Sequence, residues 1–183
     1  MLKRRDRTDR IQWKEGKMAR RCFFSFYYKR DSQRASQVRQ IGTIEGNKPA
    51  TDNDWEKVTG GGDPAIEKWI ADEMYGKSCT VVLVGSNTAN RKWINYEIVK
   101  SWDDDMGVVG IYIHGLKNLD GEISAKGDNP FDYITHGPTG KKLSSIVKCY
   151  NPAGENSKER YDWISKHLAN AVEEGIKIRS ENQ

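Results

Sequence analysis

Long apolar runs, paired cysteines and glycine-rich phosphate loops are all missing from this sequence. No uninterrupted apolar stretch comes near the roughly 18 residues of a membrane-spanning helix. The three cysteines, Cys22, Cys79 and Cys149, are far apart and odd in number. We therefore expect reduced, mostly buried thiols in a cytoplasmic protein rather than disulfides. Neither G-x-x-x-x-G-K-[ST] nor G-x-G-x-x-G is present, which excludes the two common phosphate-cradling loops.

The sequence also lacks an excess of basic residues outside its N-terminal segment, because acidic and basic residues balance over the rest of the chain. The net charge of +4 lies entirely in residues 1–17, which hold seven lysines and arginines against three acids. The neutral remainder argues against nucleic acid as a partner. The basic segment lacks the apolar core of a secretory signal. We expect residues 1–18 to be an extension without a structural role, 19–175 to form a single domain, and 176–183 to be a tail.

Side chains that would define metal sites or covalent catalysis are absent as well. His114, His136 and His167 have no partners at metal-ligand spacing, and the sequence contains no G-x-S-x-G elbow. A phospho-receiver needs acids where its first and third strands end, but serines, Ser25 and Ser86, stand at those positions. We therefore expect no metal and no bound cofactor.

Short apolar runs alternate with amphipathic segments along the rest of the chain. Asp31, Asp63 and Ser157 stand where helix N-caps are expected. The order of elements predicts parallel strands joined by right-handed crossovers, with helices on both faces, as in the α/β flavodoxin-like class. The predicted strands cover residues 22–28, 79–85, 107–114 and 145–150, with a short one near 42–45; the predicted helices cover 31–41, 63–76, 91–102 and the segment after 157.

Glu97 occupies an unusual place in one of these helices. Ile94, Ile98 and Trp102 recur at every fourth position and mark one buried face. Glu97 follows Trp93 by four positions beside that face, near the carboxyl end of a predicted strand, where ligands of open α/β sheets bind. A partly buried carboxylate is unfavourable unless something uses it. The pattern therefore indicates a candidate site.

A purely structural role for Glu97 is the alternative on spacing alone. Glutamates at the margin of amphipathic helices are commonly solvated or paired with a neighbouring base. Arg91, Lys92 and Lys100 are all available for such a pair.

The neighbours of Glu97 suggest one kind of chemistry. A single acid beside stacking surfaces suits cleavage of an N-glycosidic bond whose leaving base is already cationic, as nicotinamide is in NAD. The carboxylate holds the ribose hydroxyls and stabilises an oxocarbenium-like transition state, while rings sandwich a base. His114 ends a predicted strand at the same edge and could line the same pocket. The neighbouring aromatic and hydroxyl residues are Ser25, Phe26, Tyr27, Tyr28, Ser86 and Trp93.

These residues resemble the TIR family. Residues 21–26 are similar to its first-strand box, although Arg21 stands where an acid is common, and Trp93 with Glu97 matches its W-x-x-x-E helix motif. The resemblance narrows to the TIR-like subunit of the bacterial Thoeris anti-phage system and covers roughly residues 19–170. The segments that carry it are 21–28, 82–88, 90–93, 96–98, 110–113 and 126–133.

The resemblance implies an activity, partners and a site. Glu97 would be catalytic and support loss of nicotinamide from NAD, the ADP-ribose being released as a cyclised or conjugated signal for a separate effector. A phage-derived trigger and homo-oligomeric TIR contacts are implied, the latter partly through residues 45–63. The expected substrate contacts are Ser25, Phe26, Tyr27, Ser86, Trp93, His114 and Asn129.

Two other functions stay open at this point. One is a catalytically idle TIR-like adaptor, in which Glu97 serves helix packing. The other is nucleoside deoxyribosyl transfer, which also uses a glutamate on a similar fold but needs a further acid to protonate a neutral leaving base.

Overall fold

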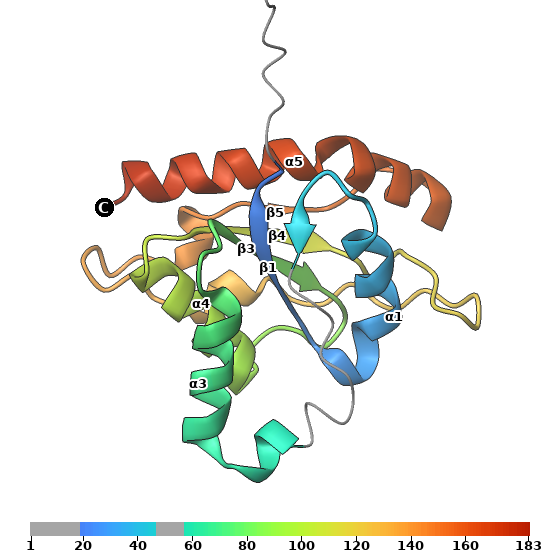
Figure 1. Ribbon diagram of the computed structural model, residues 1–183. Coiled ribbons are helices and arrows are strands. Elements are labelled where there is room, and N and C mark those ends of the chain that lie inside the picture. The colour runs from blue at the N-terminus through green and yellow to red at the C-terminus, as the bar shows by residue number, and fades with distance from the viewer. Residues whose placement is uncertain (1–18, 47–56) are drawn as a thin grey trace, which may run out of the picture.

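Among the residues that the structure describes, five strands form one parallel sheet in the order β2-β1-β3-β4-β5 (Figure 1). The computed structural model describes residues 19–46 and 57–183. The sheet order is that of flavodoxin-like folds, which confirms the predicted class. The strands are β1 (Arg21–Phe26), β2 (Glu45–Gly46), β3 (Cys79–Val84), β4 (Gly107–Tyr112) and β5 (Cys149–Tyr150).

Helices cover both faces of the sheet, because its central strands are apolar on both sides. Every residue of β3 and β4 is buried, as expected for strands without a solvent face. Figure 1 shows α5 and α1 on one face and α3 with α4 on the other. The helices are α1 (Tyr28–Arg39), α3 (Asp63–Met74), α4 (Lys92–Asp103) and α5 (Ser157–Glu181), with short 3₁₀ turns η1 (Pro130–Tyr133) and η2 (Leu143–Ser145).

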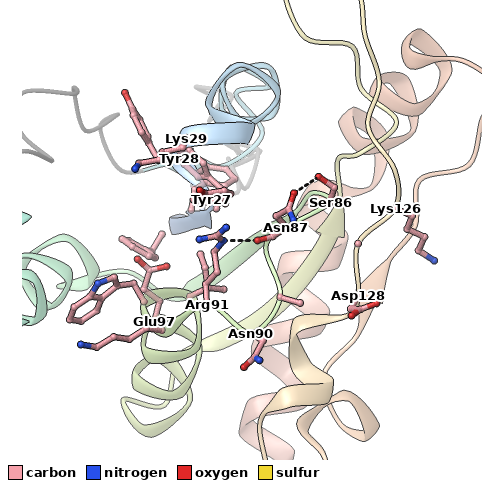
Figure 2. Close-up of a pocket in the computed structure, with 18 of the residues that line it drawn as sticks. Tyr27, Tyr28, Lys29, Ser86, Asn87, Asn90, Arg91, Glu97, Lys126 and Asp128 are labelled. Atoms are coloured by element: carbon pink, nitrogen blue, oxygen red, sulfur yellow. Dashed lines mark hydrogen bonds between the residues drawn. The ribbon is translucent and has the colours of Figure 1, made fainter.

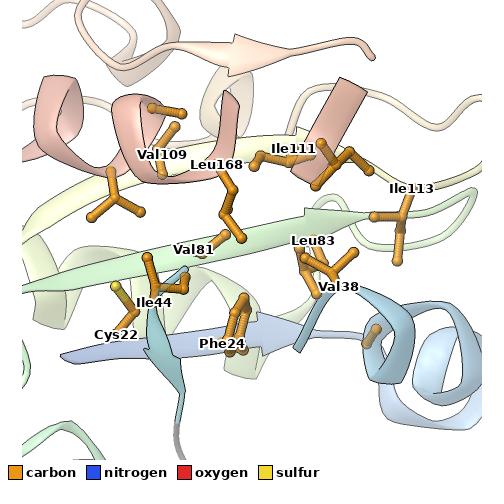
Figure 3. Close-up of a cluster of buried hydrophobic side chains, with 14 of the residues drawn as sticks. Cys22, Phe24, Val38, Ile44, Val81, Leu83, Val109, Ile111, Ile113 and Leu168 are labelled. Atoms are coloured by element: carbon orange, nitrogen blue, oxygen red, sulfur yellow. The ribbon is translucent and has the colours of Figure 1, made fainter. Parts of the chain in front are cut away.

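The larger core lies between the sheet and the pair α1 and α5 (Figure 3). Leu168 of α5 and Val38 of α1 pack against Val81 and Leu83 of β3. Gly107 begins β4 directly beneath α5, where a Cβ atom would lie 2.7 Å from the backbone nitrogen of Ile176. The close approach of helix and strand therefore depends on the missing side chain at this position.

Helix starts differ from the sequence expectation at three places. α1 begins at Tyr28, so Asp31 lies inside the helix, buried and 3.5 Å from Arg34, instead of capping it. Gly62 rather than Asp63 is the N-cap of α3. Asn156 rather than Ser157 caps α5, because its side chain accepts a hydrogen bond from the Glu159 backbone nitrogen.

The expected boundary at residue 175 is not an end of structure. α5 continues to Glu181, and Ile176 packs against the core. Arg179 is 8% exposed; its Nε donates to the Trp102 carbonyl at 2.8 Å and its Nη2 to Asp105 at 2.5 Å. Residues 176–181 are thus part of the domain rather than a tail. The expected extension, residues 1–18, lies outside the described residues.

The cysteines and the lengths of the helices bear on two further expectations. Cys22 and Cys79 are buried, Cys149 is partly buried, and all three are free thiols. Among the described residues, no helix combines the length and the apolar character needed to cross a membrane.

We predict that Arg179→Ala lowers the free energy of unfolding by about 1–3 kcal/mol. The change removes the charged side-chain donor to the Trp102 carbonyl, the ion pair with Asp105 and the cation above the Trp102 ring. Chemical denaturation measures the change. Lys177→Ala is the matched control, since its side chain is 72% exposed on the same helix. Equal losses in both variants would contradict a structural role for the end of α5.

Candidate active site

A pocket of about 890 Å³ opens at the carboxyl ends of β1 and β3 (Figure 2). Its walls come from the start of α1, the segment between β3 and α4, the first turns of α4, and residues 126–128. α3 contributes Trp69. The location is where ligands of open α/β sheets bind. The lining residues are Phe23, Phe24, Phe26, Tyr27, Tyr28, Lys29, Arg39, Trp69, Ser86, Asn87, Ala89, Asn90, Arg91, Lys92, Trp93, Ile94, Glu97, Lys126, Gly127 and Asp128.

Glu97 is the buried acid of this pocket. It is 7% exposed, and one carboxyl oxygen accepts a hydrogen bond from the Ser25 hydroxyl at 2.5 Å. Burial raises the pKa of Glu97 to about 8, although the hydrogen bond from Ser25 opposes the shift. The carboxyl group therefore changes charge near neutral pH, which is the range that acid–base and electrostatic catalysis use.

The position of Glu97 follows from how α4 packs. Ile94, Ile98 and Trp102 are buried, as their spacing predicts. Behind Glu97, the Ser101 hydroxyl donates to the Glu97 carbonyl at 2.6 Å and lies 2.6 Å from the Thr80 hydroxyl of β3. These polar contacts fix the register of the helix against the strand.

Aromatic rings surround the carboxyl group. Phe26 and Tyr27 follow one another at the end of β1, and Trp93 precedes Glu97 by one turn of α4. Trp93 lies edge-on to Tyr96 at 5.7 Å between ring centroids. Trp69 was not expected from the sequence, because only tertiary packing brings α3 to this wall.

Ser25 and Ser86 have different places in the site. Ser25 is 1% exposed and lies behind Glu97 rather than in the lining, so it acts on the carboxyl group instead of on a ligand. Ser86 lines the pocket, and its hydroxyl donates to the Asn87 side chain at 3.0 Å.

Besides Ser25, two further expected substrate contacts, His114 and Asn129, do not reach the pocket lining. Nε2 of His114 lies 3.4 Å from Nη1 of Arg160, and its ring is edge-on to Tyr112. Asn129 instead caps η1, because its side chain accepts from the Phe131 backbone nitrogen at 3.0 Å. His114 was expected in the site because it ends a predicted strand, and Asn129 because it lies in a family motif. The direction of each side chain is instead set by its hydrogen-bond partner.

Gly127 closes one side of the pocket. A Cβ atom there would lie 2.3 Å from the Gly85 carbonyl oxygen at the end of β3, so only glycine lets this segment approach so closely. The capped turn at Asn129 and the buried ring of Phe131 hold the segment in place. The role of the 126–131 segment is thus to build the wall.

Within residues 19–46 and 57–183, no group of three or more histidine, cysteine, aspartate or glutamate side chains is arranged to hold a metal ion.

The 2-1-3-4-5 parallel sheet, with a W-x-x-x-E helix on the wall of a pocket at its carboxyl edge, is the arrangement of a TIR-like domain. The sequence matches the family described as "Thoeris protein ThsB, TIR-like domain" over residues 23–118, more than half of the chain. The chain belongs to this family. A Bacillus cereus (strain MSX-D12) protein named "Putative cyclic ADP-D-ribose synthase ThsB1" is 37% identical over 133 residues, covering 69% of each chain.

We predict that Glu97→Gln stabilises the protein at alkaline pH. The folded chain keeps the Glu97 proton up to about pH 8, whereas its ordinary pKa is 4.5. The unfolded chain therefore binds fewer protons between these values, and stability falls as pH rises through this window. The neutral amide avoids this loss, so the variant should gain about 1–3 kcal/mol over the native protein at pH 9 and little at pH 5.

Thermal unfolding at the two pH values measures this difference. Glu67→Gln removes an exposed carboxylate from α3 and serves as the control. A stability difference for Glu97→Gln that does not change with pH would contradict the burial of an ionisable acid.

Proposed function

We propose that this protein cleaves the bond between nicotinamide and ribose in NAD and releases the ADP-ribose part as a cyclic signal that activates a separate effector. The buried carboxyl group of Glu97, beside aromatic walls in a pocket at the sheet edge, carries the proposal. The name of the Bacillus cereus relative, "Putative cyclic ADP-D-ribose synthase ThsB1", supports it.

The reaction follows from the groups present. The carbon–nitrogen bond breaks with its electron pair passing to the pyridinium nitrogen, so nicotinamide leaves neutral and needs no general acid. The ribose becomes oxocarbenium-like, and the Glu97 carboxylate stabilises this positive charge. Attack by a nucleophilic atom of the same molecule closes a ring and loses a proton; attack by water gives ADP-ribose.

Because Glu97 is buried, the charge of a bound substrate also affects whether its carboxyl group is protonated. Its raised pKa keeps much of the acid protonated in the free protein at neutral pH. A bound pyridinium cation favours the carboxylate, because opposite charges at short range in a buried site attract strongly. The substrate therefore helps to create the anion that its own cleavage needs.

Partners follow from the proposed signalling role. We propose that a phage-derived component switches the protein on and that copies of the chain associate in the active state. Residues 45–63 are the expected contact segment, of which 47–56 lie outside the described residues. The isolated protein should therefore be slow until triggered or concentrated.

The direct test incubates the pure protein with NAD, with and without phage-infected lysate, and follows nicotinamide release by chromatography. We predict release under the triggered condition and a loss of at least about 100-fold in Glu97→Gln, because the amide cannot supply the stabilising charge. Glu67→Gln should match the native rate. Equal turnover by Glu97→Gln would refute catalysis by Glu97, and no turnover under any condition would support the adaptor alternative.

We predict that kcat/KM for NAD rises with pH through about 8, since the free protein must lose the Glu97 proton. Ser25→Ala removes the hydrogen bond that favours the carboxylate, so the rising limb should move to higher pH. Rate profiles from pH 6 to 10 under the triggered condition measure both effects. Ser36→Ala, exposed on α1, is the control. An unshifted limb in Ser25→Ala would mean that another group controls the profile.

A further inference from the structure

Arg91 holds a fixed position in the pocket, although it is a long basic side chain at a pocket wall. Its guanidinium carbon lies 3.3 Å from the centroid of the Tyr27 ring. Its Nε donates to the Asn87 carbonyl at 2.6 Å. Figure 2 shows the guanidinium group beneath Tyr27, with the bond to Asn87 drawn as a dashed line. Both contacts orient the planar group without neutralising its charge.

The two terminal nitrogens of Arg91 are available to a ligand. Among the described residues, neither of them makes a hydrogen bond or ion pair. By contrast, the neighbouring Lys92 is engaged with Asp63, and the Lys126 ammonium group lies over the Tyr112 ring. A guanidinium group held by ring stacking and its Nε presents a ready-made fork for phosphate oxygens.

The charge of the lining favours an anionic ligand. Five basic residues face two acids, Glu97 and Asp128, in the pocket wall. Asp128 already accepts a hydrogen bond from the Tyr133 hydroxyl. The basic residues of the lining are Lys29, Arg39, Arg91, Lys92 and Lys126.

The separation of the Arg91 and Glu97 backbones is of the order of the length of a ribose with its 5′-phosphate. Arg91 immediately precedes α4, and Glu97 lies six residues further along the chain. The rise of an α-helix puts their backbones roughly 9 Å apart along the axis. A ribose and its 5′-methylene span the gap between a reacting sugar carbon and the first phosphate, and one rigid helix fixes the separation of the two groups.

We propose that Arg91 is the specificity residue that binds the diphosphate of the dinucleotide, with Tyr27 as the positioning residue that holds the guanidinium group in place. The identity of the reacting sugar rests on the proposed function, whereas recognition of a diphosphate by Arg91 does not. Arg91 therefore selects phosphate-bearing substrates over nicotinamide nucleosides.

The first test measures binding without turnover. Isothermal titration of the full chain with ADP-ribose should show a Kd roughly 10- to 100-fold weaker in Arg91→Gln than in the native protein, the range expected for one lost charge-assisted contact. Arg91→Lys should fall between the two, because a point charge cannot form the fork. Arg30→Gln removes an equal charge from the exposed face of α1 and should bind as the native protein does.

Tyr27 variants test the positioning role. Tyr27→Phe keeps the ring beneath which Arg91 lies and should retain affinity for ADP-ribose, whereas Tyr27→Leu removes it and should weaken binding several-fold. Thermal unfolding of each variant confirms that the fold is intact. Affinity for ADP-ribose that is within twofold of native in Arg91→Gln, or no binding to the native protein, would overturn the proposal.

Turnover separates this inference from the proposed function. Under the triggered condition, Arg91→Gln should raise KM for NAD while cleavage of nicotinamide riboside, which has no phosphate, stays as in the native protein. Arg91-dependent binding of ADP-ribose without NAD cleavage would uphold the inference and refute the proposed function. NAD cleavage with unchanged KM in Arg91→Gln would uphold the function and refute the inference.

Discussion

The hydrogen bond between Ser25 and the buried Glu97 carboxyl group is the interaction on which the site depends. It joins the end of β1 to α4 across the carboxyl edge of the sheet. A carboxyl group at this depth is held in its neutral form by desolvation, and Ser25 partly restores its acidity. The balance leaves an acid whose charge responds to what enters the pocket. Such an acid lowers the stability of the empty protein, as preorganised sites commonly do.

The parallel sheet provides this arrangement because it gathers chain segments that are far apart in sequence. Ser25 pairs with Val82 in the sheet register, so β1 and β3 end at the same edge of the sheet. Tyr27 and Ser86, which follow these strands, therefore both line the pocket. Each strand end leads directly into a wall of the pocket. Gly127 then permits a third segment to close against the Gly85 carbonyl. The position of the pocket is thus determined by the backbone, through the strand register and the close approach at Gly127.

Periodicity predicted the buried face of α4 correctly, because Ile94, Ile98 and Trp102 respond to the same core that the pattern describes. The alternation of strands and helices predicted the parallel sheet with helices on both faces. The contribution of Trp69 and the position of His114 outside the pocket lining could not be predicted, since both depend on packing between elements distant in sequence. The prediction that Asp31 caps α1 was wrong, because the sequence does not distinguish an N-cap aspartate from a buried aspartate in the first turn of a helix.

Glu97 lies in α4, and Arg91, which we propose to bind phosphate, is the N-cap residue of the same helix, so a movement of α4 affects both groups. The contacts of Ser101 with Thr80 and with the Glu97 carbonyl fix how far α4 lies along β3. Any event that shifts α4 against the sheet moves Glu97 relative to Ser25 and Arg91 relative to Tyr27 at the same time. Cooperative packing makes such shifts discrete rather than gradual. A partner that contacts α4 or its neighbouring segments could therefore change affinity and reactivity together, without entering the pocket.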